Sequence, residues 1–171
     1  MNLLLMRHAK SSMDNPNGKD FDRLLVEQGE RDAYIMGEFL NDSGYKPDLI
    51  ITSSAKRARQ TTELITDAAG IDSDLIQLDD EFYFASVDAY VNAIHRTDSA
   101  IGKLMLVGHN PLMEQLLSLL TVGSDTGPFI FSTSDIACVE MIAPAWKDVR
   151  KGGNRLKWFI SPQILPRDGK K

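Results

Sequence analysis

The segment Leu-Leu-Leu-Met-Arg-His at residues 3–8 decides how the rest of this sequence is interpreted. Four apolar residues in succession form a run of strand length, and a basic residue followed by an imidazole ends it. An apolar run without polar alternation is typical of a strand covered on both faces, as in parallel sheets. Asp-Leu-Ile-Ile-Thr at 48–52 and Lys-Leu-Met-Leu-Val at 103–107 have the same character. The sequence therefore predicts a buried, mostly parallel sheet.

Amphipathic segments alternate with these apolar runs. We expect helices over residues 28–42, 53–69, 87–96 and 111–120. Weaker strand patterns lie at residues 75–78, 136–142 and 155–160, and the last two can form an antiparallel edge. Asn110 is expected to cap the last helix, with Pro111 as its first residue. The alternation predicts an α/β protein: a three-layer α/β/α sandwich with a mostly parallel central sheet.

Length and charge limit the possible functions. The 171 residues correspond to about one domain, expected over residues 1–160, with residues 161–171 as a loose C-terminal tail. Lys and Arg number 19 against 24 Asp and Glu, so the net charge of −5 disfavours nucleic acid and membrane surfaces as partners. A single cysteine, Cys138, excludes an internal disulfide and a cysteine-built zinc site. The N-terminal apolar run is too short for a signal sequence, and we expect a cytoplasmic protein.

Polar clusters follow three of the predicted strands directly. Arg7 and His8 follow the first, Ser-Ser-Ala-Lys-Arg-Ala-Arg at 53–59 follows the second, and Gly-His-Asn at 108–110 follows the strand at 103–107. Ligands of open α/β sheets bind beyond the carboxyl ends of the strands. Each cluster alone has an ordinary structural explanation as a surface segment or a helix start. Their coincidence at one edge predicts a local positive site in an acidic protein.

Phosphate chemistry suits these residue types. Arginine presents a planar fork to phosphoryl oxygens, and helix N-termini add backbone donors. Neutral imidazole is a competent nucleophile near pH 7, and neighbouring arginines lower the pKa of such a histidine. A second imidazole can donate a hydrogen bond to the group in transfer. The pattern therefore favours phosphoryl transfer.

Three motifs carry a resemblance to a known family. Leu-Met-Arg-His-Ala at 5–9 resembles the Arg-His-Gly signature of the histidine phosphatase (phosphoglycerate mutase-like) superfamily. The segment at 53–61 resembles its second arginine motif, and Val-Gly-His-Asn-Pro at 107–111 its second histidine motif. Small size and the run Arg-His-Ala-Lys-Ser at 7–11 are most similar to the SixA-type phosphohistidine phosphatase branch. The resemblance spans about residues 1–142 and implies a histidine phosphatase-like fold without a metal or cofactor.

The resemblance implies roles for individual residues. It identifies His8 as the nucleophile that becomes phosphorylated, and the phosphate pocket is completed by Arg7, Arg57 and His109. Lys10 and Ser11 are further candidates for substrate binding, from the loop after the first strand. We expect Arg59 to be a solvated helix residue.

Two positions depart from the family pattern. Ala9 stands where the signature has glycine, and a left-handed backbone there would strain alanine. Asp14 falls where many relatives carry a phosphate-contacting asparagine, and a carboxylate would repel phosphate.

The general acid of the family has no clear counterpart. The candidates are Asp14, Asp80 and Glu81, although the run Asp-Asp-Glu at 79–81 is better interpreted as a solvated acidic turn. General acid catalysis contributes roughly 10²–10⁴-fold, so a missing acid favours a labile phosphoryl donor.

The function predicted is therefore hydrolysis of phosphohistidine on a protein substrate, a reaction of signal transduction, through a covalent intermediate on His8. The alternatives are a small-molecule phosphomonoesterase or mutase, a non-catalytic phosphate-binding module, and a two-histidine metal site. The metal site lacks an evident third ligand, and arginines repel cations. Residues outside the motifs are expected to be structural: His95 facing solvent and Cys138 in the core. Thr133 and Ser134 are weaker candidates for the pocket entrance.

Overall fold

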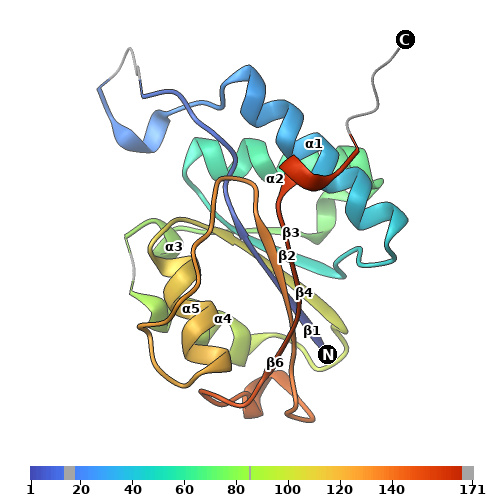
Figure 1. Ribbon diagram of the computed structural model, residues 1–171, viewed down its shortest axis with the longest axis vertical. Coiled ribbons are helices and arrows are strands. Elements are labelled where there is room, and N and C mark those ends of the chain that lie inside the picture. Colours follow the sequence, from blue (N-terminus) through green and yellow to red (C-terminus); the bar gives the residue numbers. More distant parts are fainter. Residues whose placement is uncertain (14–17, 85, 167–171) are drawn as a thin grey trace.

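The computed structural model describes residues 1–13, 18–84 and 86–166. Its centre is a six-stranded sheet of order β3-β2-β4-β1-β5-β6 (Figure 1). The strands are β1 (Asn2–Arg7), β2 (Leu49–Ser53), β3 (Ile76–Asp79), β4 (Lys103–Gly108), β5 (Ile136–Glu140) and β6 (Arg155–Ile160). The pairs formed among β1 to β4 are parallel, whereas β5 is antiparallel to both β1 and β6. The predicted sandwich with an antiparallel edge is confirmed.

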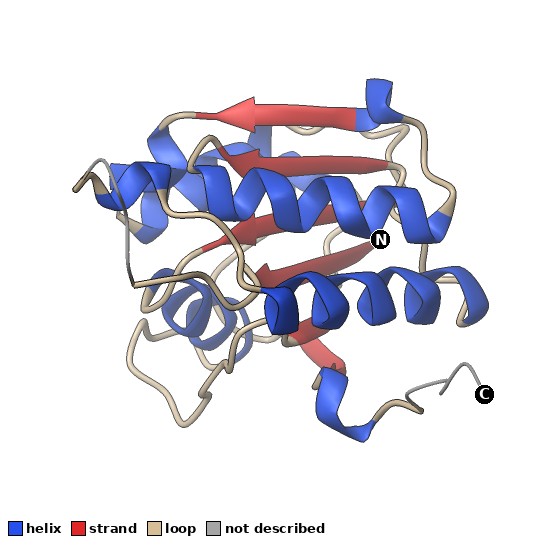
Figure 2. Cartoon of the chain, turned by 90° about the horizontal axis from the view of Figure 1, so that it is seen from above, coloured by secondary structure: helices blue, strands red, loops and turns tan. Residues whose placement is uncertain are grey.

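Helices cover both faces of this sheet. They are α1 (Glu27–Asp42), α2 (Lys56–Ala69), α3 (Glu81–Phe84), α4 (Val87–Arg96) and α5 (Leu112–Thr121), with short 3₁₀ turns that include η1 (Asp20–Asp22) and η4 (Pro162–Ile164). The two long helices α1 and α2 pack together and run in front of the strands in Figure 2. The helices α4 and α5 pack on the opposite face.

The central strand β1 divides its side chains between the two halves of the core. Leu3 and Leu5 are fully buried in the half that includes α4 and α5, and Leu4 and Met6 in the half that includes α1 and α2. Burying one such side chain contributes about 1.5–3 kcal/mol. A one-residue slip of β1 would exchange the two sets of side chains between the layers. The position of the next residues, at the carboxyl end of β1, is therefore held by packing.

Most predicted boundaries hold to within a few residues, but the start of α5 differs. Gly70 ends α2 with φ of 60°, the left-handed conformation that glycine adopts easily. The helix α5 begins at Leu112 rather than Pro111, and the predicted cap by Asn110 is wrong. The amide of Asn110 instead donates to Glu114 Oε1 at 2.6 Å and to the carbonyl of Phe131 at 3.0 Å. It thereby ties the loop before β5 to α5.

The segment after β6 packs against the domain further than predicted. Pro162 is buried in η4, and Leu165 packs against the half of the core that includes α1. The prediction of a loose tail from residue 161 is therefore wrong for residues 161–165, because apolar side chains in this segment find a surface to cover. Residues 167–171 lie outside the described residues.

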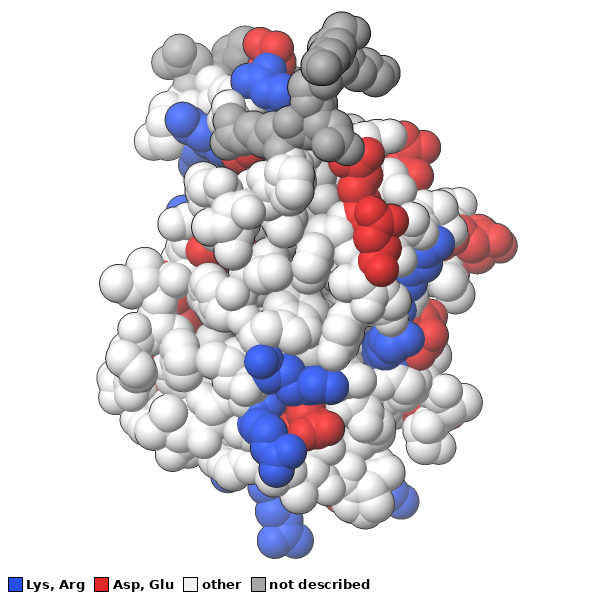
Figure 3. Space-filling model, turned by 45° about the vertical axis from the view of Figure 1, so that its right-hand side comes forward, with Lys and Arg blue, Asp and Glu red and all other residues white. Residues whose placement is uncertain are grey.

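Basic and acidic side chains alternate over the surface at short range. On the face drawn in Figure 3, the basic and acidic side chains of the described residues are interspersed, without a broad basic surface. No helix within the described ranges combines the length and apolar character that a membrane span requires. The cytoplasmic location stays a prediction.

Candidate active site

The carboxyl ends of β1, β4 and β2 bring the three polar clusters together. Arg7 lies opposite Gly108 in the parallel ladder of β1 and β4, so His8 and His109 leave the sheet side by side. The strand β2 adjoins β4, and α2 starts three residues after its end, which places Arg57 over the same edge. A cavity of about 450 Å³ lies there, lined by Arg7, His8, Lys10, Ser11, Met13, Arg23, Arg57, His109, Asn110 and Thr133.

His8 is buried, and its two ring nitrogens have different partners. Nδ1 lies 2.7 Å from the carbonyl oxygen of Ala9, which can only accept, so Nδ1 carries the proton. Nε2 then has a free lone pair, and it accepts a hydrogen bond of 3.1 Å from Nε of Arg57. The backbone thus orients the ring, and Nε2 is the nitrogen whose lone pair could act as a nucleophile.

The charge state of His8 follows from its surroundings. Burial, the largest cause, together with the nearby His109, Arg57 and Arg7, lowers the pKa of His8 to about 3, against the hydrogen bond to Ala9 that raises it. Desolvation and positive neighbours both disfavour the imidazolium form. The ring is therefore neutral at physiological pH, as nucleophilic attack requires.

His109 is oriented by a serine at the end of β2. Its ring lies 4.9 Å from that of His8, centroid to centroid, and its Nε2 lies 3.0 Å from Ser53 Oγ. Ser53 Oγ also accepts from the N–H of Ala55, and it can donate its own proton to Nε2. With that donation, the proton of the neutral ring lies on Nδ1. Burial, with the positive charge of Arg57, lowers the pKa of His109 to about 4.

Besides the hydroxyl of Ser134, two buried nitrogens that can donate at this edge have no hydrogen-bond partner within the described part of the chain. One is Nδ1 of His109 and the other is Nε of Arg7, whose Nη1 donates to the carbonyl of Phe131 at 2.7 Å. Buried donors are paired in the great majority of cases, because an unpaired one costs about 1–3 kcal/mol. A phosphoryl group between His8 and these donors would supply acceptors for both.

Arg57 is buried and held by a residue that the sequence motifs did not indicate. Nη1 donates to the backbone carbonyl of Asp20 at 2.7 Å and Nη2 to its carboxylate at 2.9 Å. The same carboxylate accepts from Arg23 at 2.9 Å and from the hydroxyl of Tyr83 at 3.0 Å. Burial raises the pKa of Asp20, but the hydrogen bonds from Arg23, Arg57 and Tyr83 outweigh it and hold the pKa at about 2.

No sequence signal separates Asp20 and Arg23 from the other polar residues of the loop before α1. That loop has no helical or strand period, and its residues reach the site only because η1 folds back onto the start of α2. Tyr83 was missed because the four-residue α3 is too short to produce a helical pattern.

The other candidates of the loop after β1 take different positions. Lys10 and Ser11 both line the cavity; Lys10 is exposed, and Ser11 Oγ accepts from Arg23 at 3.0 Å. Ala9 is buried, and its N–H donates to Thr61 Oγ1 at 3.0 Å. Among the described non-glycine residues, positive φ occurs only at Ser134, so the expected strain at Ala9 is absent.

Thr133 lines the cavity, and Ser134 is fully buried behind it. The N–H of Ser134 donates to the carbonyl of Arg7 at 3.1 Å, which fixes the last loop to the end of β1. Arg59 is half-exposed beside Glu63, as a solvated helix residue is expected to be. His95 is exposed and Cys138 is buried in the core, as predicted.

The general-acid candidates that the structure describes do not line the cavity. Asp80 and Glu81 are exposed and absent from its lining, and the neighbouring Asp79 pairs with Arg96. Asp14 lies outside the described residues. Asp20, whose carboxylate binds Arg57, has a pKa of about 2, so it is ionised at physiological pH and has no proton to give.

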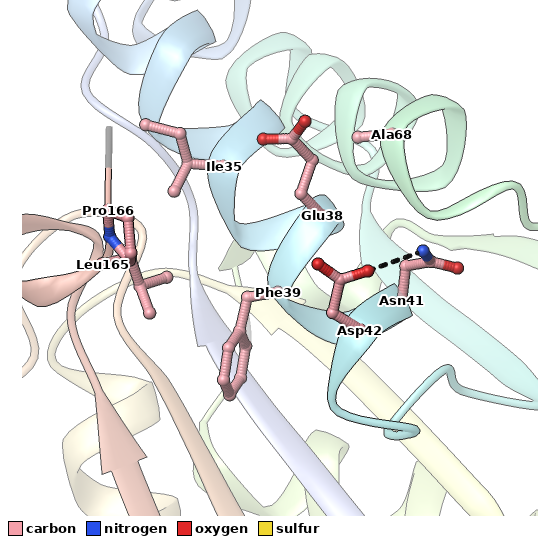
Figure 4. A pocket seen from close by; sticks show the side chains of 8 residues that line it. All are labelled: Ile35, Glu38, Phe39, Asn41, Asp42, Ala68, Leu165 and Pro166. Carbon is pink, nitrogen blue, oxygen red and sulfur yellow. Dashed lines mark hydrogen bonds between the residues drawn. The ribbon is translucent and has the colours of Figure 1, made fainter. Parts of the chain in front are cut away.

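A second concavity, of about 370 Å³, lies between α1, α2 and the segment after β6 (Figure 4). It carries Glu38 and Asp42 on α1, and Phe39 faces Leu165 across it. Among the described residues, its lining contains Glu38 and Asp42 but no Lys, Arg or His to pair with a phosphate. The group of cations and imidazoles at the end of β1 remains the site suited to phosphate.

Comparison with known proteins places this site in a family. The model of the histidine phosphatase superfamily (branch 1) matches residues 3–83, which contain Arg7, His8 and Arg57. A solved structure assigned as the phosphohistidine phosphatase SixA of Agrobacterium tumefaciens is 36% identical, with a TM-score of 0.76, covering 94% of this chain and 97% of that one. The chain belongs to the histidine phosphatase superfamily.

This histidine phosphatase has SixA proteins among its relatives. It is 26% identical over 165 residues to the phosphohistidine phosphatase SixA of Escherichia coli K12, covering 95% of this chain and 94% of the relative. The structure of the protein histidine phosphatase SixA complexed with tungstate matches with a TM-score of 0.83 at 23% identity, covering 97% and 100% of the two chains, and so shares the fold. The protein is a phosphatase, a hydrolase, as the sequence motifs predicted.

Proposed function

We propose that this phosphatase hydrolyses phosphohistidine on a protein substrate, in two steps, through a phosphohistidine intermediate on His8. The observation that carries the proposal is the position of the neutral Nε2 of His8 beside two unpaired buried donors, on Arg7 and His109. A nucleophile and free donors for phosphoryl oxygens are what in-line phosphoryl transfer needs. The SixA relatives support the choice of substrate class.

In the first step Nε2 of His8 attacks phosphorus in line with the leaving nitrogen. The new P–Nε2 bond forms as the substrate P–N bond breaks, and the electron pair of that bond goes to the leaving imidazole. The leaving group is neutral where its other nitrogen already carries a proton. Arg57 gives up its hydrogen bond to Nε2 and turns the same N–H to a phosphoryl oxygen. Arg7 Nε and His109 Nδ1 donate to the remaining oxygens, where charge develops.

In the second step water attacks the phosphorus of the intermediate. The P–Nε2 bond breaks, its electron pair returns to His8, and the proton of water passes to solvent as inorganic phosphate forms. The hydrogen bond from His8 Nδ1 to the carbonyl of Ala9 keeps the ring in place through both steps. Each step thus needs only groups that line the cavity or support its rings.

The positions of the candidate carboxylates that the structure describes favour a labile phosphoryl donor. Asp80 and Glu81 lie outside the cavity lining, and Asp20 is held ionised by Arg23 and Arg57. An alkoxide leaving group needs a proton from such an acid, whereas the imidazole of phosphohistidine leaves readily without one.

Exposed apolar side chains around the site favour a protein surface as the carrier of the phosphoryl group. Met13 lines the cavity with 83% of its surface exposed, and Phe84, 87% exposed, packs against Tyr83. Ile130, 79% exposed, precedes Phe131, whose carbonyl accepts from Arg7. Apolar groups beside a polar site are typical of protein contacts, whereas a small, polar sugar phosphate would not bury them.

The test compares turnover of a phosphohistidine-bearing protein with turnover of sugar phosphates and phosphoglycerates. We expect hydrolysis of the phosphohistidine protein, acid-labile label trapped on His8, and loss of both in His8→Ala. His95→Ala is the matched control, because His95 is an exposed histidine outside the site. Preference for phosphomonoesters would support the small-molecule alternative, and binding without turnover would support the non-catalytic module.

A further inference from the structure

The guanidinium group of Arg57 uses its two edges differently. The edge formed by Nη1 and Nη2 is taken by Asp20, through the backbone carbonyl at 2.7 Å and the carboxylate at 2.9 Å. The adjacent edge, which includes Nε, faces Nε2 of His8 at 3.1 Å. The guanidinium is planar, so holding one edge sets the direction of the other.

The carboxylate of Asp20 is itself held from more than one side. Oδ1 accepts from Arg23, and Oδ2 accepts from Tyr83 as well as from Arg57. Arg23 in turn donates from Nε to the carbonyl of Ser12 at 2.6 Å and from Nη2 to Ser11. Although 51% of the Asp20 side chain is exposed, these contacts leave it little rotational freedom.

We infer that Asp20 is a positioning residue, which holds Arg57 so that its Nε edge meets the phosphoryl group at His8. The inference rests on the proposed function of this site and adds a residue that the family motifs of the sequence did not indicate. Asp20 does not touch the reacting atoms; it acts through Arg57. A buried arginine without this partner has rotamers in which its fork misses the phosphoryl oxygens, and misplacement by about 1 Å can lower a rate about 100-fold.

The opposite role for Asp20 is that of an internal anion that competes with the substrate for Arg57. The contacts disfavour it, because Asp20 occupies the Nη1/Nη2 edge through its backbone carbonyl and its carboxylate, and leaves the edge beside His8 to the phosphoryl group. Competition predicts that removal of the carboxylate lowers KM and raises kcat/KM. Positioning predicts a fall in kcat.

The chain offers a matched control in the same turn. Asp22 lies in η1 beside Asp20 and pairs with Lys56 at 3.0 Å, outside the cavity lining. Asp22→Asn removes one negative charge and one ion pair from the same turn without touching Arg57. It separates loss of the Asp20–Arg57 contact from a general change in charge or in the anchoring of η1.

The experiment is a double-mutant cycle with phosphoimidazole as donor, read by steady-state and single-turnover rates. We expect Asp20→Ala to lower kcat/KM about 10-fold, mainly in kcat, and Asp22→Asn to change it less than about 2-fold. In the Arg57→Ala background, Asp20→Ala should have an effect under about 2-fold, because the group it positions is gone. Asp20→Asn serves as a second variant, and thermal unfolding confirms that each protein is folded.

The outcomes separate the inference from the proposed function. If Arg57→Ala leaves turnover unchanged, the proposed site itself is wrong. If Arg57→Ala is slow but Asp20→Ala lowers the rate by the same factor in both backgrounds, only the positioning role is overturned. An increase of kcat/KM in Asp20→Asn would also overturn it, in favour of competition.

Discussion

The Nε–H group of Arg57 donates a hydrogen bond of 3.1 Å to Nε2 of His8, the ring nitrogen with the free lone pair. The cation thus lies next to the nucleophile of the proposed mechanism and, together with burial as the largest cause, lowers the pKa of His8. In this arrangement one contact performs two tasks. It disfavours the imidazolium form, and it places a donor where phosphoryl oxygens arrive.

The first prediction concerns activity at low pH. The pKa of His8 is lowered to about 3 and that of His109 to about 4, so both rings stay neutral well below the ordinary histidine pKa of 6.5. We expect kcat/KM to show no loss from enzyme protonation between pH 7 and 5, after correction for the uncatalysed rate and ionisation of the donor. A pH profile checks this. An enzyme pKa near 6.5 in that profile would contradict the neutral, buried pair.

The second prediction concerns stability. A histidine whose pKa is lowered by folding binds its proton in the unfolded chain first, so stability falls as pH drops from about 6.5 towards 3. His8→Asn should therefore lose less stability than the wild type between pH 7 and 5, as measured by urea midpoints. His95→Asn, at an exposed histidine outside the site, is the control for replacing an imidazole. An unchanged slope in His8→Asn would exclude His8 as its source.

The third prediction concerns the glycine before His109. A Cβ at Gly108 would lie 2.2 Å from Oη of Tyr90 and 2.9 Å from Cε of Met113. We expect Gly108→Ala to lower stability by roughly 1–3 kcal/mol, because Tyr90 is fully buried and must shift. Thermal unfolding and labelling of His8 measure the effect. Tyr90→Phe in the same chain removes the nearest atom and should restore part of the lost stability. If it restores none, the strain does not arise at the hydroxyl of Tyr90.

The fourth prediction concerns the orientation of His109. Ser53→Ala removes the hydroxyl at 3.0 Å from His109 Nε2, so the proton of the ring is no longer directed to Nδ1. Loss of one buried hydrogen bond of about 1 kcal/mol corresponds to a roughly 5-fold lower kcat. Steady-state rates test this against Ser54→Ala, at the neighbouring buried serine. If both variants lower kcat equally, Ser53 has no specific role in orienting His109.

Several features of the site were predictable because they depend on local pattern. Each of the clusters at His8, Ser53 and His109 follows an apolar run, and parallel strands bring their carboxyl ends to one edge. The neutral state of His8 was also predictable in direction from its arginine neighbours. The size of the pKa shift was not predictable, because burial, its largest cause, depends on the whole packed core.

The features that were missed depend on contacts between distant segments. The cap predicted at Asn110 was plausible locally, but Glu114 and the loop at Phe131 compete for its amide. Asp20 and Tyr83 are 63 positions apart, and they meet at one oxygen of the Asp20 carboxylate. No period in either segment indicates that meeting, since hydrogen bonds between loops leave no repeat in the sequence.

The sequence by itself determined the succession of the strands and of the four longer helices along the chain, the burial of β1 on both faces, and the edge at which His8, Arg57 and His109 would gather. These follow from the alternation of apolar and polar residues, which a folding chain satisfies by burying its apolar side chains. Only the tertiary structure decided that His8 is protonated at Nδ1, that Ser53 orients His109 and that Asp20 holds Arg57. Hydrogen bonds depend on distances and directions at the level of tenths of an ångström, which are set when all the segments have packed.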